Sequence, residues 1–268
     1  MSAGDVVERY LTTGSYDPLF REWEGPDRRK RGTETLRQIL QRVVAHRAQH
    51  APIPARRAPP HSADLVRERV RPLVTGLFPA EAPVLLDTLP GRVAVLTLGG
   101  FPDAVAAVPL STAWDLANLL LDDLGVPPLS DDTPELDGLC AAGRAWVLPR
   151  AFAPPTATTD VIVHEVTHLL HLLRRGDVGL EPARAPVLSV PPRRRETFAY
   201  ACELWCCLTR DGSDDLPARL AALRSETGFA DARVDRATLE MLLQTCAATP
   251  PEGWGVLRRW GETGRVGP

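Results

Sequence analysis

The chain contains no apolar run that approaches the roughly eighteen residues of a membrane-spanning helix. Its first ten residues also lack the basic region and apolar core of a secretory signal. A formal net charge of −3 gives no excess of positive charge for binding a nucleic acid. These absences predict a cytoplasmic protein that has neither a membrane nor a nucleic acid as its partner.

Cysteine is scarce, and its spacing suits neither disulfides nor a thiolate metal site. The chain has five cysteines, an odd number, and no Cys-x-x-Cys pair. Cys202, Cys206 and Cys207 lie close together, but each is better interpreted as a small apolar packing residue. The sequence therefore predicts reduced, buried thiols.

Length and composition indicate a globular protein with one large domain or two lobes that share a cleft. No internal repeat or low-complexity region is present. A proline-rich connector at residues 51–60 ends an N-terminal helical region, residues 1–60. We expect residues 61–268 to form the main domain, with a first part at 61–175 and a helical part at 176–268.

Helices are expected along much of the chain because apolar residues recur with the helical period. The expected segments are residues 6–11, 34–50, 63–78, 112–124, a helix around residues 160–173, and later helices that begin near residues 195, 216 and 239. We expect Ser62 to cap the third of these helices. A mixed-charge loop is expected at residues 21–31.

Strands are expected between residues 82 and 148. They are residues 92–98 and 104–110, joined by a tight connection at 99–103, and residues 143–148. Helices and strands in separate stretches predict the α+β class, with a small antiparallel or mixed sheet. The last strand lies shortly before the motif described next, and an extended peptide could add to its edge.

What the sequence does contain is a His-Glu-x-x-His motif within an apolar segment, at residues 164–168. Residues four apart share one face of a helix, so His164 and His168 can present two imidazole nitrogens to one metal ion. Zinc favours these donors at neutral pH. Glu165 lies about 100° round the helix from His164, where its carboxylate can act on a water as a general base.

The surroundings of the motif favour a metal site over the alternative, a hydrogen-bonded histidine pair on an ordinary core helix. Val163, Val166, Leu170 and Leu173 fall on the side away from the histidines, as in a helix that is buried on its back and faces a polar cleft. Thr159 or Asp160 can cap the helix, and Arg174-Arg175-Gly176 is a typical helix end.

Two histidines bind zinc weakly, so a catalytic site needs a third protein ligand and one open position. The extended motif with a third histidine is absent, because Arg174 occupies that place. His171 lies about 10 Å further along the helix axis than His164 and cannot reach the same ion. We expect His171 to pack or to support the site.

A glutamate on a later helix is the better candidate for the third ligand. Glu196 follows His168 by 28 residues and begins a segment with an apolar side. Glu203 lies on the same face, seven residues later, and competes for the role. We favour Glu196 because it lies at the start of the helix and matches a known motif.

The pattern His164-Glu165-x-x-His168 followed by Glu196-Thr-Phe-Ala-Tyr-Ala201 resembles the gluzincin metallopeptidases. The Glu-x-Phe-Ala-x-Ala portion is similar to the glutamate helix of the anthrax lethal factor-like branch. The resemblance implies a zincin-like fold, in which a small sheet lobe with the active-site helix is followed by a helical lobe. It also implies His164, His168 and Glu196 as zinc ligands and Glu165 as the base.

Tyr200 occupies a position where this family often carries an acidic residue that orients a zinc-bound histidine. A phenol can make one hydrogen bond there but cannot raise the basicity of a ligand as a carboxylate does. The family also uses a donor that faces the developing oxyanion, and the local candidates are Tyr200 and residues 193–195, all arginines.

The motifs predict a zinc-dependent metallopeptidase that hydrolyses a peptide or protein substrate. One alternative is an inactive zincin-fold protein that binds or regulates, because position 200 is not acidic and no oxyanion donor is obvious. A second alternative is a zinc hydrolase that acts on a small non-peptide molecule. The sequence predicts no oligomeric state.

Overall fold

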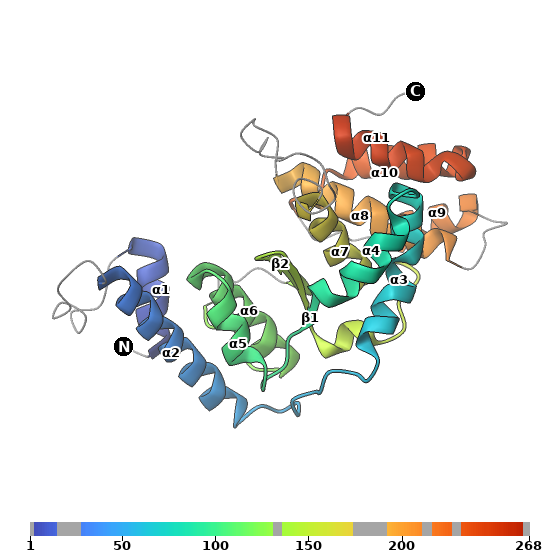
Figure 1. The fold of residues 1–268 in the computed structure, drawn as a ribbon. Helices are drawn as coiled ribbons and strands as arrows, with labels where there is room; N and C mark the ends of the chain where they lie inside the picture. The colour runs from blue at the N-terminus through green and yellow to red at the C-terminus, as the bar shows by residue number, and fades with distance from the viewer. Residues whose placement is uncertain are drawn as a thin grey trace. The chain divides into compact units, whose positions relative to one another are not determined.

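The computed structural model describes residues 3–14, 28–130, 136–173, 192–210, 216–226 and 232–264. These residues are mostly helical and include one small mixed sheet of three strands, so the predicted α+β class is confirmed (Figure 1). Within these ranges, no helix combines the length and the apolar composition that crossing a membrane requires.

Contacts divide the chain into two compact units. The first comprises Met1–Pro59, Val95–Ala142 and Trp146–Arg150, and the second comprises Pro60–Ala94, Gly143–Ala145 and Ala151–Pro268. This division rests on contacts alone, so the predicted domains at residues 1–60 and 61–268 stay a prediction.

The first unit is built around a long helix. Its elements are α1 (Ala3–Thr13), α2 (Arg28–Ala48), α5 (Phe101–Ala107), α6 (Leu110–Asp123) and β2 (Gly138–Ala141). Leu36, Leu40 and Val44 recur every four residues on α2 and are fully buried. This apolar stripe packs α2 against α1, α5 and α6. Arg37 also donates a hydrogen bond of 2.7 Å to the carbonyl of Val108.

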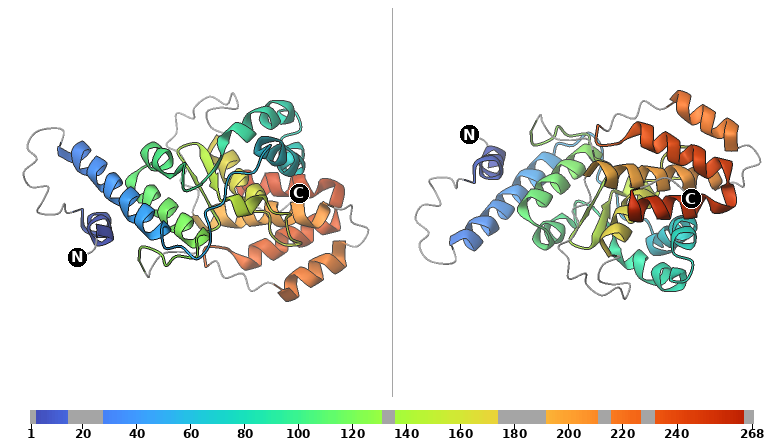
Figure 2. Two further views of the ribbon diagram at one scale, coloured as in Figure 1. Left: turned by 90° about the horizontal axis from the view of Figure 1, so that it is seen from below. Right: turned by 90° about the horizontal axis from the view of Figure 1, so that it is seen from above.

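The second unit is helical and contains the motif. Its elements are α3 (Ser62–Leu77), α4 (Ala82–Thr88), η2 (Leu89–Arg92), α7 (Val161–Leu173), α8 (Pro192–Thr209), α9 (Leu216–Glu226), α10 (Arg236–Ala248), η4 (Pro250–Glu252) and α11 (Gly253–Thr263). Every residue of α8 from Glu196 to Leu208 is buried except Tyr200. Because α7, α10 and α11 all pack on it, α8 is the central helix of this unit (Figure 2).

The strands are short. β1 (Val93–Val95) pairs with β3 (Arg144–Val147), which pairs with β2, and η3 (Pro149–Phe152) follows β3. Ala142 and Gly143 join β2 to β3 with φ angles of 51° and 70°. Positive φ at both positions is typical of the tight hairpin turn that matches the twist of the strands. The predicted strand at 143–148 is confirmed, and the one at 92–98 is shorter than predicted.

The predicted strand at 104–110 is wrong. Residues 101–107 form α5, and α6 begins at Leu110. Phe101, Ala104 and Val105 are buried at helical spacing, so the apolar run marks the inner face of a short helix and not a buried strand. The interpretation of residues 82–88 as part of a β region is wrong for the same reason, since they form α4.

The other predicted helices are confirmed in type and place, with two differences at their ends. The cap of α3 is His61 in a left-handed conformation, not Ser62. Residues 28–31, predicted as loop, belong to α2. The rest of that predicted loop, at 21–27, and the predicted end of α7 at 174–176 lie outside the described residues.

Close packing of α3 on α11 predicts that Gly76→Ala destabilises the protein. A Cβ at Gly76 would overlap the indole of Trp254, and such overpacking typically costs about 1–3 kcal/mol. Urea unfolding should therefore show a lower free energy for Gly76→Ala. The matched control is Gly91→Ala, because a Cβ at Gly91 meets no atom within 4 Å. Equal stability of the two variants would contradict this packing.

Candidate metal centre

Helix α7 presents both histidines of the motif on one side. His168 follows His164 by one turn, and their rings lie 4.8 Å apart, centre to centre. On the opposite side Val163, Val166 and Leu170 are buried, as predicted. The two imidazoles are thus held on a helix whose position is fixed by its apolar back.

Helix α8 adds a carboxylate to the two imidazoles. The Nε2 atom of His168 lies 3.1 Å from Nε2 of His164 and 3.1 Å from Oε2 of Glu196. The third side of this triangle, from His164 Nε2 to Glu196 Oε2, measures 3.8 Å. These three residues form a group that could hold a metal ion.

The size of the triangle fits a first-row divalent ion. A triangle with sides of 3.1, 3.1 and 3.8 Å has a circumradius of about 2.0 Å. Zinc bonds to nitrogen and carboxylate oxygen measure about 2.0–2.2 Å, so the spacing of these three donors fits such an ion. Three protein ligands leave one position open, as in catalytic sites.

Burial and mutual contacts shift the pKa values of all three donors. Burial acts to lower the pKa of His164, but hydrogen bonds to Glu196 and Glu203 outweigh it and raise the pKa to about 10. Burial acts to raise the pKa of Glu196, yet its two histidine neighbours hold that pKa far below the usual value. The pKa of His168 is lowered by burial. Glu196 is thus ionised at neutral pH, as a metal ligand must be.

Glu203 contacts the candidate site differently from Glu196. Its Oε2 accepts a hydrogen bond of 3.0 Å from Nδ1 of His164, and its Oε1 accepts one of 2.7 Å from the backbone N–H of Asp160. When the ring is neutral and Nδ1 keeps its proton as the donor, Nε2 of His164 carries the lone pair that a metal needs. A carboxylate in this place also makes the imidazole more basic.

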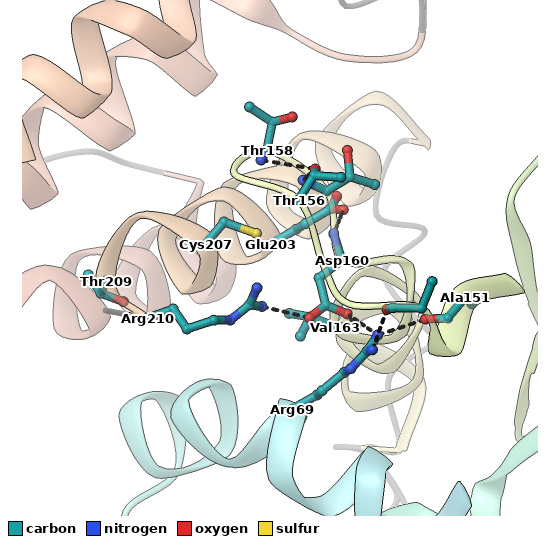
Figure 3. Close-up of polar contacts among 12 residues, drawn as sticks. Arg69, Ala151, Thr156, Thr158, Asp160, Val163, Glu203, Cys207, Thr209 and Arg210 are labelled. Atoms are coloured by element: carbon teal, nitrogen blue, oxygen red, sulfur yellow. Dashed lines mark hydrogen bonds and ion pairs between the residues drawn. The ribbon is translucent and has the colours of Figure 1, made fainter. Parts of the chain in front are cut away.

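Asp160 links Glu203, the hydrogen-bond partner of His164, to the surrounding helices (Figure 3). Its side chain is fully buried between Arg210, at 2.7 Å, and Arg69, at 3.6 Å. Its Oδ1 also accepts a weak bond of 3.4 Å from the backbone of Val163, in the first turn of α7. Burial raises the pKa of Asp160, and the two arginines oppose that rise. Asp160 thus connects α3, α7 and the end of α8.

Glu165 is a buried carboxylate with an unpaired oxygen. It is 5% exposed, and its Oε2 has no hydrogen-bond partner among the described residues. Burial raises its pKa to about 7, although the charge of His164 opposes the rise. An unpaired buried carboxylate oxygen is costly and typical of a site that meets a ligand. This oxygen can accept a proton from a molecule that enters the site.

The predicted oxyanion donors lie in different surroundings. The ring of Tyr200 packs edge-on against His164, with centres 4.6 Å apart. Arg194 points elsewhere and donates hydrogen bonds to the carbonyls of Trp260 and Gly261. Arg195 lies 3.7 Å from Oε1 of Glu196. Tyr200 and Arg195 thus stay candidates for contact with a substrate, whereas Arg194 has a structural role.

The remaining predicted side chains lie apart from the donor group. His171 packs against Phe198, with ring centres 5.1 Å apart, and both line a small apolar pocket with Leu77 and Phe78. All five cysteines are free thiols, and all but Cys140 are buried. Burial raises the pKa of the four buried thiols, which keeps them protonated.

Sequence reasoning missed two features of the site. Glu203 had been considered only as a ligand, although its position two turns after Glu196 could have indicated the orienting role. Arg233, whose Nη1 lies 3.6 Å from Oε1 of Glu196, comes from the turn before α10. No pattern in the sequence points to Arg233, because tertiary packing alone brings that turn to α8.

Comparisons of the chain with protein-family models, with curated proteins and with solved structures find no match. The donor group and its neighbours are therefore the features that indicate a function.

The different contacts of the two glutamates predict different effects on metal binding. Glu196→Gln should reduce zinc affinity severely, because an amide is a poorer ligand than a carboxylate. Glu203→Gln should keep one zinc per chain at saturation but weaken its affinity by about 10–100-fold, the typical cost of losing an orienting carboxylate. Elemental analysis and competition with a zinc chelator measure both. Equal losses in the two variants would contradict this assignment.

The contacts of Arg69 predict a large effect on stability. Arg69 donates to the carbonyls of Ala151, Phe152 and Ala153 and pairs with Asp160. Arg69→Met should lower the free energy of unfolding by about 3 kcal/mol. The three carbonyls would lose a charged donor, and the buried carboxylate of Asp160 would lose one of its two arginine partners. Arg71→Met, at an exposed position of the same helix, should change it by less than about 0.5 kcal/mol. Similar midpoints in urea would contradict the role of Arg69.

Proposed function

We propose that this protein is a zinc-dependent metallopeptidase with a zincin-like, gluzincin-type centre. The observation that carries the proposal is the buried carboxylate of Glu165, with an unpaired oxygen, adjacent in sequence to a three-donor group on α7 and α8. Zinc is the proposed metal because two imidazoles and one carboxylate are a donor set that catalytic zinc sites use. Peptides or proteins are the proposed substrates, and the cytoplasm is the proposed location.

The proposed reaction is hydrolysis of a peptide bond by water. Zinc bound by His164, His168 and Glu196 would act as a Lewis acid. Glu165 would take a proton from the attacking water and pass it to the leaving amine. A carboxylate with a pKa near 7 is suited to both transfers at neutral pH. Tyr200, beside His164, is the proposed neighbour of the developing oxyanion.

The contacts of Glu203 weaken the alternative of an inactive binding protein. That alternative depends on two features, the absence of an acidic residue at position 200 and the lack of an obvious oxyanion donor, and Glu203 bears on the first. Glu203 supplies the missing carboxylate from another position on the same helix, with its oxygen 3.0 Å from Nδ1 of His164. A protein that had lost catalysis would have no need to keep this support together with an unpaired Glu165.

Replacement of the proposed base tests the function directly. Glu165→Gln has nearly the same shape and lacks the proton-accepting carboxylate, so it should retain one zinc per chain while peptide hydrolysis falls by a factor of at least about 10³. Cleavage of a peptide mixture, followed by mass spectrometry, gives the rate.

The matched control is Glu240→Gln, which removes an exposed carboxylate on α10 and should leave the rate unchanged. Wild-type cleavage rates in Glu165→Gln would refute the assignment of the base. A zinc-loaded wild-type protein that cleaves no peptide in the mixture would refute the proposal of a peptidase.

A further inference from the structure

We propose that Arg195 and Arg233 form a carboxylate-binding site at the metal centre, so that preferred peptides carry a carboxylate next to the bond that is hydrolysed. This inference rests on the proposed function. The two arginines come from different elements, the first turn of α8 and the turn before α10, and both approach the same ligand residue, Glu196.

The two oxygens of Glu196 face different partners. Oε2 lies 3.1 Å from Nε2 of His168 and belongs to the donor triangle. Oε1 lies 3.7 Å from Nη2 of Arg195 and 3.6 Å from Nη1 of Arg233. Both distances exceed that of a hydrogen bond. Glu196 thus attracts the two guanidinium groups to the site by its charge.

The positive groups are the accessible ones. The side chains of Arg195 and Arg233 are 42% and 48% exposed, whereas that of Glu196 is 5% exposed. Glu165 and Glu203 are also buried. A molecule that approaches Glu196 from the side of the arginines therefore meets positive charge, although the centre contains three carboxylates.

Arg195 retains a donor that its surroundings do not use. Its Nε is buried and has no hydrogen-bond partner among the described residues. The same holds for Nε of the neighbouring Arg194, but its Nη2 donates to two carbonyls and its guanidinium group lies over the ring of Trp260. Backbone carbonyls therefore hold the guanidinium group of Arg194, whereas the side chain of Arg195 is 42% exposed beside Glu196.

A carboxylate is the anion that suits this pair in a peptidase. A guanidinium group binds a carboxylate through two parallel N–H donors, and two such groups can hold one carboxylate between them. Both guanidinium groups lie within 4 Å of Glu196. A peptide carboxylate bound by them would therefore hold the peptide near the metal donors. The carboxylate can belong to an acidic side chain or to the C-terminus of the peptide.

Binding to a protein that cannot turn over tests the inference separately from catalysis. The protein is full-length, zinc-loaded Glu165→Gln. Three labelled peptides serve as probes: acetyl-Ala-Ala-Phe-Glu-Ala-Ala-amide, its Gln twin, and acetyl-Ala-Ala-Phe with a free C-terminus. Fluorescence anisotropy gives each dissociation constant, and elemental analysis gives the zinc content of every variant.

We expect one of the two carboxylate peptides to bind about tenfold more tightly than the Gln twin, since charge-assisted pairs are strong at such a site. Adding Arg195→Gln or Arg233→Gln should reduce this preference to less than about threefold. Arg236→Gln removes an equal charge at an exposed position of α10 and should leave the preference intact. Whichever carboxylate peptide binds more tightly identifies the source of the carboxylate.

Two results would overturn the inference. One is equal binding of all three peptides, or no measurable binding of any. The other is an equal loss of affinity for charged and neutral peptides in Arg195→Gln and Arg233→Gln, together with a lower zinc content. The arginines would then act only on the ligand Glu196 and not on the peptide. Neither result bears on hydrolysis by the wild-type protein, so the proposed function fails or survives by its own assay.

Discussion

The buried carboxylate of Asp160 is the contact on which the geometry of the metal centre depends. It lies between Arg69 of α3 and Arg210 at the end of α8, and its own backbone N–H holds Glu203. Removing a carboxylate from water is expensive, and two guanidinium groups offset that cost only if they stay in place. Together with the apolar back of α7, this constraint holds α7 against α8 and so sets the distance from His168 to Glu196.

Helix α8 has two functions that are usually assigned to different elements. It is the central helix of its unit, buried along most of its length, and it also carries the third donor and the carboxylate that orients His164. Seven residues separate Glu196 from Glu203, which is two helical turns, so both carboxylates lie on the face toward α7. Glu196 has a histidine partner, and Glu203 has a histidine and a backbone partner, as burial of charge requires.

The sequence alone was sufficient where the information was local. The pairing of His164 with His168 follows from the period of one helix, and the resemblance of residues 196–201 to a known motif pointed to Glu196. The orienting role of Glu203 and the place of Arg233 depend on how α7, α8 and the turn before α10 pack. No local pattern encodes such packing. The prediction of a strand at 104–110 is wrong because a short apolar run fits a strand as well as the inner face of a short helix.

The three donors come from two helices, and 28 positions separate His168 from Glu196 along the chain. An ion held by all three would therefore be a cross-link that closes a loop of the backbone. Closing a loop of this length in an unfolded chain costs conformational entropy, much as a disulfide does. Occupancy of the centre would thus be linked to folding of the second unit, because a bound ion would also hold together the two helices that supply its ligands.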